Sequence, residues 1–423
     1  MQVCERELMA KNSASKREKC ILLYSGGLDT SVIVHWLASK GYEVICVTID
    51  CGQQEDINFK SKALGAGAKK FFIKDVRADF VTNGIFQCLR AQAKYEGRYL
   101  LGTSIARPFM IKALCDVAQA EGTNLIAHGA TGKGNDQCRF ELAAYALIPG
   151  ARILAPWRDQ EFRTLIPGRM EAIAYAAQHK IPIQATAQKS WSTDPNLQHR
   201  SHEAGELEDP WHSPREEMFQ LITPPAKAPD QSEEVHIDFE RGYPVALNGK
   251  RLKPVVLLEQ LNVIAGRNGV GLTDMVENRF VGMKSRGVYE APGVTVLYEA
   301  HRDLEGLTLD RKVMQIRDGL VPTYAQLVYD GFWFSPAKEA LDALVEKTQE
   351  TVTGTVRLEL YKGSLRVTGR KSPYSLYDES VATMEAGGSY NQDDATGFLR
   401  IQGLPTRIQA NLRQRMSKQS RSS

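Results

Sequence analysis

The sequence predicts an α/β protein: an N-terminal domain with a parallel sheet, a second, α+β domain and a C-terminal helical tail. Over roughly the first 180 residues, short apolar runs alternate with helix-like stretches, which is typical of a parallel sheet with helices on both faces. The pattern changes near Ile181, after which strand-like and helix-like runs follow in a mixed order. The length of 423 residues also favours two domains.

The strands predicted in the N-terminal domain are short, apolar and rich in Val and Ile, as burial on both faces requires. They are Ile21–Tyr24, Val44–Asp50, Lys70–Lys74, Asn124–His128 and Ile153–Pro156. The helices predicted between them are Leu28–Ser39, Asp56–Leu64, Ala78–Ala93 and Arg107–Ala120. Gly41 follows the end of the first helix, as a helix stop often does.

The second part of the chain begins with a segment of weak periodicity. Residues 184–230 are rich in Pro, Ser, Glu and Trp, so we expect a long loop-like connection. The strand-like runs that follow are Glu234–Phe239, Tyr243–Leu247 and Pro254–Val256, and a helical region is predicted near Leu257–Val263. These patterns predict a disordered leader at 1–19, domains at 20–182 and 183–399, and a tail at 400–423.

The tail has a weak helical pattern. Ile408, Leu412 and Met416 fall on one helical face, and several basic residues but no acid accompany them. A helix this short and this polar is marginal alone. We therefore expect either docking on another subunit or a frayed, solvated tail.

Composition argues against several classes of protein. The net charge of +3 gives no overall field that would favour nucleic acid. No apolar run approaches the roughly 20 residues that span a membrane, and residues 1–19 lack the apolar core of a secretory signal. The seven cysteines form no Cys-x-x-Cys pair, so we expect reduced thiols and a cytoplasmic location.

The stretch Tyr24-Ser-Gly-Gly-Leu-Asp-Thr-Ser31 joins the first predicted strand to the first helix. Its tight Gly-Gly turn would present free backbone N–H groups at a helix N-terminus, where an anion is favoured. Ser25, Thr30 and Ser31 add hydroxyl donors. Asp29 would repel a phosphate unless a metal ion lay between them, so the stretch predicts a Mg-bound pyrophosphate. An ordinary strand–turn–helix connection is the alternative.

This stretch matches neither the Gly-x-x-x-x-Gly-Lys phosphate loop nor the Gly-x-Gly-x-x-Gly dinucleotide pattern. Its Ser-Gly-Gly-x-Asp-x-Ser form resembles the pyrophosphate loop of ATP pyrophosphatases. Those enzymes cleave ATP between the α- and β-phosphates and adenylate a substrate. The resemblance implies a Rossmann-like, pyrophosphate-loop nucleotide-binding domain.

A second glycine-rich segment, His128-Gly-Ala-Thr-Gly-Lys-Gly-Asn-Asp-Gln-Cys-Arg139, follows a predicted strand. Lys133 is a point charge suited to phosphate, and Arg139 is a planar fork suited to a carboxylate. Thr131, Asn135 and Asp136 could fix a small polar ligand through its ammonium and carboxylate groups. A glycine-rich turn with a solvated lysine is the alternative.

Other polar segments are less specific. Gly-Thr-Ser ahead of Arg107-Pro108 predicts a helix start, with Thr103 or Ser104 as N-cap. The segments Trp191–Asp194, Ser201–Gly205 and Val276–Glu290 fit either ligand binding or solvated loops. His199 and His202 are too few for a metal site, so we expect a solvated loop there.

Together these segments resemble the argininosuccinate synthase family. The motifs are Tyr-Ser-Gly-Gly-Leu-Asp-Thr-Ser from Tyr24, Arg-Tyr-Leu-Leu-Gly-Thr-Ser from Arg98, Gly-Ala-Thr-Gly-Lys-Gly-Asn-Asp-Gln from Gly129, Glu-Asn-Arg-Phe from Glu277 and Gly-Met-Lys-Ser-Arg-Gly from Gly282. The resemblance extends from about Ile21 to Leu399, whereas GMP synthetase and asparagine synthetase share only the first motif. Residues 1–19 and the chain end depart from the family pattern.

The resemblance implies a ligase of arginine biosynthesis that uses ATP and Mg. The ureido oxygen of citrulline attacks the α-phosphorus of ATP, diphosphate leaves, and the amine of aspartate displaces AMP from a citrullyl-adenylate. Positioning and charge stabilisation would then supply most of the catalysis. A homotetramer with an intersubunit C-terminal helix is also implied.

The resemblance also implies a set of site residues. For ATP they are Leu23, Tyr24, Ser25, Gly26, Gly27, Leu28, Asp29, Thr30, Ser31, Ile49, His128, Gly129, Gly132 and Lys133. For citrulline they are Tyr99, Ser104, Asn135, Arg139, Ser192, Ser201, Glu277 and Tyr289, and for aspartate Thr131, Asn135 and Asp136. Asp29, Lys133 and Arg139 are the expected catalytic residues, with Mg near Asp29.

Two other functions are compatible with the first motif. A pyrophosphate-loop tRNA sulfur transferase would need a catalytic cysteine pair or a nucleic-acid-binding domain, and the sequence shows neither pattern. A regulatory protein that binds nucleotide without turnover would not need Asp29, Lys133 and Glu277, all of which are present.

Overall fold

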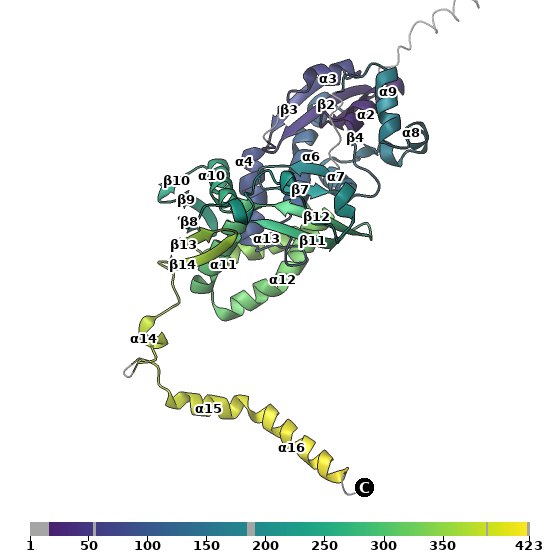
Figure 1. Cartoon of the computed structure of the whole chain (residues 1–423). Coiled ribbons are helices and arrows are strands. Elements are labelled where there is room, and N and C mark those ends of the chain that lie inside the picture. Colours follow the sequence, from purple (N-terminus) through teal and green to yellow (C-terminus); the bar gives the residue numbers. More distant parts are fainter. Residues whose placement is uncertain (1–16, 54–55, 184–190, 386–387, 421–423) are drawn as a thin grey trace, which may run out of the picture. The chain divides into compact units, whose positions relative to one another are not determined.

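The computed structural model of the protein describes residues 17–53, 56–183, 191–385 and 388–420. The chain forms two compact units, which divide between Tyr374 and Ser375 (Figure 1). Most of the predicted leader lies outside the described residues. Within the described residues, no helix combines the length and the apolar character that crossing a bilayer would need.

The first unit begins with a five-stranded parallel sheet in the order β3-β2-β1-β4-β5, as the α/β prediction required. Its strands are β1 (Lys19–Leu23), β2 (Glu43–Asp50), β3 (Lys70–Asp75), β4 (Leu125–Ala127) and β5 (Arg152–Leu154). The strand order reverses between β1 and β4. Ligands of such sheets bind at this switch point, beyond the carboxyl ends of the strands.

Helices cover both faces of this sheet. They are α2 (Leu28–Ser39), α3 (Lys60–Gly65), α4 (Arg77–Asp79), the π-helix η1 (Phe80–Ile85), α5 (Phe86–Arg90), α6 (Gly102–Glu121), α7 (Asp136–Leu147), α8 (Gln160–Leu165) and α9 (Arg169–Gln178). Along β1, Cys20 and Leu22 belong to a core cluster with α2, whereas Ile21 packs in the cluster that contains α6. The strand is therefore buried on both faces, which explains its continuous apolar sequence.

Three N-terminal helix predictions differ from the structure. Helix α2 has the predicted bounds, but α3 begins at Lys60 rather than Asp56, and the third predicted helix is broken into α4, η1 and α5. Helix α6 starts at Gly102, so Thr103 and Ser104 lie in its first turn and the N-cap prediction is wrong. Leu101 occupies the N-cap position in a left-handed conformation, and Pro108 lies inside the helix.

The rest of the first unit contains two antiparallel sheets and a group of helices. One sheet has the order β10-β9-β8-β13-β14 and the other β11-β12-β7-β6. The strands are β6 (Ser192–Pro195), β7 (Arg200–Glu203), β8 (Glu233–Glu240), β9 (Tyr243–Leu247), β10 (Lys250–Arg251), β11 (Leu272–Asn278), β12 (Lys284–Glu290), β13 (Gly354–Tyr361) and β14 (Ser364–Lys371). The helices are α10 (Pro254–Arg267), α11 (Pro292–Thr308), α12 (Arg311–Asp330) and α13 (Pro336–Thr348).

Three expectations for this region are wrong. Pro254–Val256 is not a strand but the first turn of α10, because Pro254 occupies a first helical position, where its missing N–H costs nothing. The loop predicted for 184–230 contains β6 and β7, although residues 184–190 lie outside the described part. His199 and His202 are buried rather than solvated.

A buried carboxylate fixes the sheet that contains β7 and β12. The side chain of Glu290, at the end of β12, accepts hydrogen bonds from the backbone N–H groups of Gln220, Leu221 and Ile222 at 2.7–2.9 Å. His202 on β7 contacts the same carboxylate at 2.7 Å. These contacts attach the chain that follows β7 to the strand that carries Tyr289.

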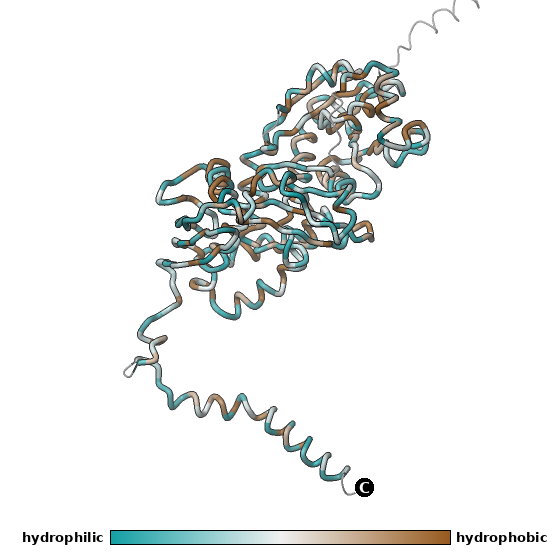
Figure 2. The backbone as a smooth tube through the Cα atoms, viewed as in Figure 1, coloured by the Kyte–Doolittle hydropathy of each residue, from teal (hydrophilic) through white to brown (hydrophobic). Residues whose placement is uncertain are grey.

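The second unit contains α14 (Glu379–Ala382), α15 (Asp393–Gln402) and α16 (Leu404–Gln419). The predicted tail therefore contains a helix, and Leu404, Ile408, Leu412 and Met416 recur along it at every fourth position. Figure 2 shows hydrophobic and hydrophilic stretches alternating along this end of the chain. No side chain of α15 or α16 is buried.

Candidate active site

Two loops meet at the switch point of the parallel sheet. The first connects β1 to α2 and contains Ser25, Gly26 and Gly27. The second connects β4 to α7 and contains the predicted His128–Asn135 segment. Both follow the carboxyl ends of neighbouring strands, because β1 pairs with β4. The fold therefore brings together two motifs that lie about a hundred residues apart.

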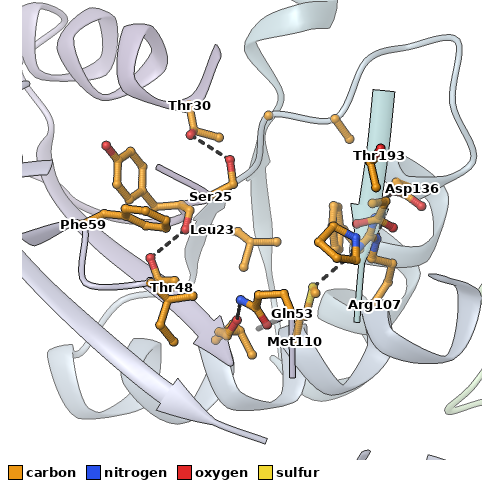
Figure 3. A pocket seen from close by; sticks show the side chains of 18 residues that line it. Leu23, Ser25, Thr30, Thr48, Gln53, Phe59, Arg107, Met110, Asp136 and Thr193 are labelled. Atoms are coloured by element: carbon orange, nitrogen blue, oxygen red, sulfur yellow. Dashed lines mark hydrogen bonds and ion pairs between the residues drawn. The ribbon is translucent and has the colours of Figure 1, made fainter. Parts of the chain in front are cut away.

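A pocket of about 440 Å³ opens at these loops (Figure 3). Of the predicted ATP residues, its lining includes Leu23, Tyr24, Ser25, Thr30, Ile49 and Gly129. Thr48, Gln53, Ile57, Phe59, Met110 and Phe140 complete one part of the wall. Phosphate-suited hydroxyls thus lie at one end, and apolar side chains suited to a flat ring line much of the rest.

The first loop is shaped for close approach of a ligand to its backbone. Gly26 has φ +73°, and a Cβ there would lie 2.5 Å from the ring of Phe59. Helix α2 has Gly27 at its N-cap and no side-chain cap, so its first N–H groups are open to an anion. Ser25 Oγ and Thr30 Oγ1 lie 3.1 Å apart at this end of the pocket.

Other predicted ATP residues lie behind this surface. Ser31 is fully buried and its hydroxyl lies 2.9 Å from the Tyr24 hydroxyl, so it supports the loop. His128 is also buried: its Nδ1 accepts from the N–H of Ala130 and its Nε2 contacts Glu141. Leu28, Gly132 and Lys133 are not part of the pocket lining, and the Lys133 side chain is exposed.

Asp29 projects from the first turn of α2 and is exposed. Within the described residues it makes no hydrogen bond, and no cluster of three or more His, Cys, Asp or Glu side chains forms a metal site. Mg²⁺ commonly takes only one or two protein carboxylates together with substrate phosphates and water. A single free carboxylate beside an anion-binding loop fits that chemistry.

A second pocket, of about 190 Å³, adjoins the first. Eight of the predicted amino-acid-binding residues line it: Tyr99, Thr131, Asn135, Asp136, Arg139, Ser201, Glu277 and Tyr289. They come from α7 and the loop before it, from the turn before α6, and from β7, β11 and β12. Ser192 is exposed and lies outside this lining.

Four residues line both pockets, namely Arg107, Ala130, Asp136 and Asp194. Arg107 Nε lies 2.9 Å from Asp136 Oδ2, and its Nη2 lies 2.7 Å from Asp194 Oδ2. Figure 3 shows Arg107 and Asp136 across the first pocket from Ser25 and Thr30. Burial alone would raise the pKa of Asp136, but Arg107 and Arg139 lower it to about 2. The shared wall therefore contains two carboxylates joined by one guanidinium, and the Asp136 carboxylate is ionised.

Arg139 and Glu277 are two buried charged residues among those that line the second pocket. Arg139 Nη1 bonds to Asp136 at 3.0 Å and its Nε donates to the Tyr329 carbonyl at 2.8 Å, which leaves Nη2 for a ligand. The Glu277 carboxylate is 6% exposed and accepts from Tyr289 at 2.9 Å and Tyr329 at 2.7 Å. One acid and one base in a small pocket suit the two ends of an α-amino acid.

Burial shifts the pKa of two groups here. Burial raises the pKa of Glu277, and hydrogen bonds from Tyr329 and Tyr289 and the charges of Arg139 and Arg279 oppose that rise. Burial also lowers the pKa of His199 to about 3, helped by Arg200, Arg107 and His202, so its imidazole is neutral. The His199 ring packs against Gly102, where a Cβ would come within 2.7 Å of it.

Two predicted residues have buried polar atoms without a partner among the described residues. They are Ser104 Oγ and Asn135 Oδ1. Buried polar groups are nearly always hydrogen-bonded, so such atoms mark places where water or a ligand binds. Asn135 lies in the pocket lining, whereas Ser104 lies in the first turn of α6, outside that lining.

Five further residues line the second pocket although no motif assigned them to the site: Thr103, Arg107, Asp194, Glu203 and Arg279. Thr103 and Arg107 lie in the predicted helix start, and the other three lie in segments that fit either ligand binding or solvated loops. Thr103 Oγ1 contacts Asp194 at 3.0 Å and His199 at 3.1 Å, and Arg279 pairs with Glu203. Their polar side chains and their place in those segments were the only available signal.

Comparison with known proteins gives consistent matches over nearly the whole chain. The model described as the arginosuccinate synthase N-terminal HUP domain matches residues 19–182, and the one described as the arginosuccinate synthase C-terminal domain matches residues 191–409. Argininosuccinate synthase of Moorella thermoacetica is 54% identical over 400 residues, which cover 94% of this chain and 97% of that protein. The enzyme of Syntrophus aciditrophicus is 54% identical over 395 residues, covering 93% and 98%.

Proposed function

The chain belongs to the argininosuccinate synthase family, and we propose from that premise that its two adjoining pockets carry the two halves of the reaction. The chain is an ATP-dependent ligase that converts ATP, L-citrulline and L-aspartate to AMP, diphosphate and argininosuccinate. The observation that carries the proposal is the wall shared by the two pockets, because a phosphate in one must meet an acceptor in the other.

In this proposal ATP occupies the first pocket. Its adenine lies toward Ile49, and its phosphates lie at the Ser25–Thr30 loop and the α2 N-terminus, where N–H groups and hydroxyls converge. The α-phosphate then faces the shared wall. Lys133, on the exposed second loop, supplies a positive charge to the outer phosphates.

Citrulline occupies the second pocket. Its ammonium pairs with Glu277 and its carboxylate with Arg139, which directs the ureido oxygen toward the wall that contains Arg107. Tyr99, Ser104, Ser192, Ser201 and Tyr289 are the remaining proposed citrulline residues. Arg107 contacts Asp136 and Asp194 through Nε and Nη2, so it positions these carboxylates rather than gripping a substrate.

Aspartate binds beside citrulline, at Thr131, Asn135 and Asp136. Asp136 is ionised, which suits the aspartate ammonium before its proton leaves, and the free Oδ1 of Asn135 can accept from either substrate. Attack of the amine on the adenylated carbon then expels AMP. Little covalent help from the protein is required, so orientation and fixed charge supply the catalysis.

We propose Mg²⁺ as the companion of ATP, near Asp29. Bound there, it would neutralise charge on the departing diphosphate. Asp29 would hold it as a single carboxylate ligand, which the free side chain at the start of α2 supports.

The assay for this function measures AMP and diphosphate release from ATP. We expect release at the full rate only when citrulline and aspartate are both present, and argininosuccinate in a one-to-one ratio with AMP. Omitting citrulline should abolish turnover, because citrulline supplies the attacking oxygen. AMP release that ignores citrulline, or no release with all three substrates, contradicts the proposal.

We propose that the protein is a homotetramer and that α16 contributes to its contacts. The support is the line Leu404, Ile408, Leu412 and Met416, whose side chains are at least half exposed within their unit. Truncation after Pro405 should yield a smaller species on a sizing column, whereas Arg413→Gln, which keeps the apolar line, should not. A truncated chain of unchanged size would rule out this role.

We further propose that the chain is organised as domains 20–182 and 183–399 with a tail at 400–423, and that the enzyme is cytoplasmic. The six described cysteines are free and are buried or half-buried, as expected in a reducing compartment. Limited proteolysis tests the boundaries, and cell fractionation tests the location.

A further inference from the structure

Tyr329 lies at the end of α12, outside every motif that identified the site, and is fully buried. Its hydroxyl donates to Glu277 Oε1 at 2.7 Å, while the Tyr289 hydroxyl donates to Oε2 at 2.9 Å. Each oxygen of the carboxylate is thus held by one phenol. Tyr289 lines the second pocket, whereas Tyr329 does not.

The same residue also holds Arg139. The main-chain carbonyl of Tyr329 accepts from Arg139 Nε at 2.8 Å, and the guanidinium lies 4.9 Å from the centre of the Tyr329 ring. A single residue therefore contacts both Glu277 and Arg139, the first through its hydroxyl and the second through its ring and carbonyl.

Tyr329 is itself fixed on two sides. Its ring stacks on Tyr95 with centroids 3.6 Å apart and planes 5° from parallel. After it, Gly331 has φ +98°, and a Cβ there would lie 2.8 Å from the Cα of Arg139. The end of α12 therefore packs directly on the backbone of α7 and has little freedom to move.

We infer that Tyr329 is a positioning residue that sets the geometry of Glu277 and Arg139, and thereby selects a substrate with both an ammonium and a carboxylate group. This inference rests on the proposed assignment of citrulline to the second pocket. Because Tyr329 stays outside the pocket, its effect on the substrate passes through those two side chains. A support of this kind keeps charged groups in one geometry before the ligand arrives.

The test compares Tyr329→Phe with Tyr324→Phe. Tyr324 lies on the same helix, is 2% exposed, and donates to Asp342 at 2.7 Å, so it provides a matched loss of one buried phenol hydroxyl. Tyr329→Phe should raise the KM for citrulline about ten- to hundred-fold, as expected for one hydrogen bond to a charged group. The KM values for ATP and aspartate and the kcat should stay within about three-fold.

Selectivity supplies a second readout. 5-Ureidopentanoate lacks the ammonium group of citrulline. Tyr329→Phe should therefore lower the kcat/KM for citrulline relative to that for 5-ureidopentanoate, and Tyr324→Phe should leave this ratio unchanged. An unchanged citrulline KM in Tyr329→Phe overturns the inference. So does an equal rise in both variants, or an equal rise for all three substrates.

If Tyr329→Phe does not fold stably, Tyr95→Leu provides a second test. This variant removes the ring that stacks on Tyr329 and leaves the side chains of Glu277 and Arg139 unchanged. It should raise the citrulline KM selectively by several-fold, and a wild-type KM there overturns the inference. Assays of the wild-type enzyme distinguish a failure of the proposed function from a failure of the role of Tyr329. Absence of citrulline-dependent AMP release in the wild type defeats the proposed function, whereas active enzymes with equal citrulline KM defeat only the role of Tyr329.

Discussion

Replacing Arg107 with Met is expected to lower kcat/KM for every substrate by about 10²- to 10³-fold. The buried guanidinium joins Asp136 and Asp194 in the wall between the two pockets. Removing one partner of a buried ion pair leaves an unpaired charge and costs about 3–5 kcal/mol. Here two carboxylates lose their shared cation, so they would repel each other at the place where we propose that the ureido oxygen meets the α-phosphate.

Arg77 offers a matched control for this change. It also bridges two aspartates, Asp75 and Asp50, but its side chain is 40% exposed. Arg77→Met should leave the kinetics close to those of the wild type, since exposed ion pairs contribute little. Arg107→Lys should recover only part of the activity, because an ammonium lacks the planar fork that reaches both carboxylates. Initial rates with each substrate varied in turn provide the measurement, and a fully active Arg107→Met enzyme would contradict the role of the shared wall.

Replacing Glu277 with Gln is expected to raise the citrulline KM by about 10²-fold, with a smaller change in kcat. The carboxylate is the only acidic group held between two buried phenols in the described pocket lining. Loss of a buried pairing with an ammonium costs about 2–5 kcal/mol. Glu203→Gln is the control, since that side chain lines the same pocket but is about half exposed and pairs with Arg279. We expect a clearly smaller effect from it.

The same carboxyl should give the citrulline KM a dependence on pH. Burial raises the pKa of Glu277 despite the opposing hydrogen bonds and charges of Tyr329, Tyr289, Arg139 and Arg279. As pH falls through that raised pKa, the carboxylate is protonated, loses its attraction for the ammonium, and the citrulline KM should rise. Glu277→Gln should lose this dependence. A parallel rise in the variant would assign the titration to another group.

The effect of Glu277 protonation on the stability of the fold distinguishes the expected rise in citrulline KM from acid unfolding. A carboxyl whose pKa is raised on folding binds protons more readily in the folded state, so protonation of Glu277 stabilises the folded protein as the pH falls. The expected rise in citrulline KM therefore accompanies no loss of stability from this group. Asp136 behaves oppositely: its pKa is lowered to about 2, and its contribution to stability is lost as the pH falls toward that value. Thermal denaturation measured over the same pH range separates the two.

The N-terminal sheet and α2 were predictable because they depend on local pattern. Buried parallel strands are uniformly apolar, and Gly41 marks the end of α2 with φ +91°. The error at Pro254–Val256 has the opposite cause, because a proline followed by two valines resembles the start of a strand, although proline also suits the first position of a helix. His199 and His202 appeared solvated because the burial of a polar side chain depends on partners distant in sequence, such as Thr103 and Glu290.

The site was predictable where a motif carries its own chemistry. The first loop and Arg139 are of this kind, and eight of the amino-acid-binding residues expected from the resemblance line one pocket. Arg107 and Asp194 were not predicted, because their ion pair joins residues 87 positions apart. Tyr329 gave no signal at all, since Val-Tyr-Asp-Gly reads as an ordinary helix end. Contacts of this kind are set by tertiary packing.

The central claim is that the shared wall lets the ureido oxygen of citrulline attack the α-phosphorus of ATP. Following the transfer of that oxygen tests the claim most directly. The measurement uses citrulline labelled with ¹⁸O in the ureido group, with mass spectrometry of the products after turnover with ATP and aspartate. We expect one ¹⁸O atom in the phosphate of each AMP, because aspartate displaces AMP by breaking the bond between carbon and that oxygen. Label in water or in diphosphate, with none in AMP, would contradict it.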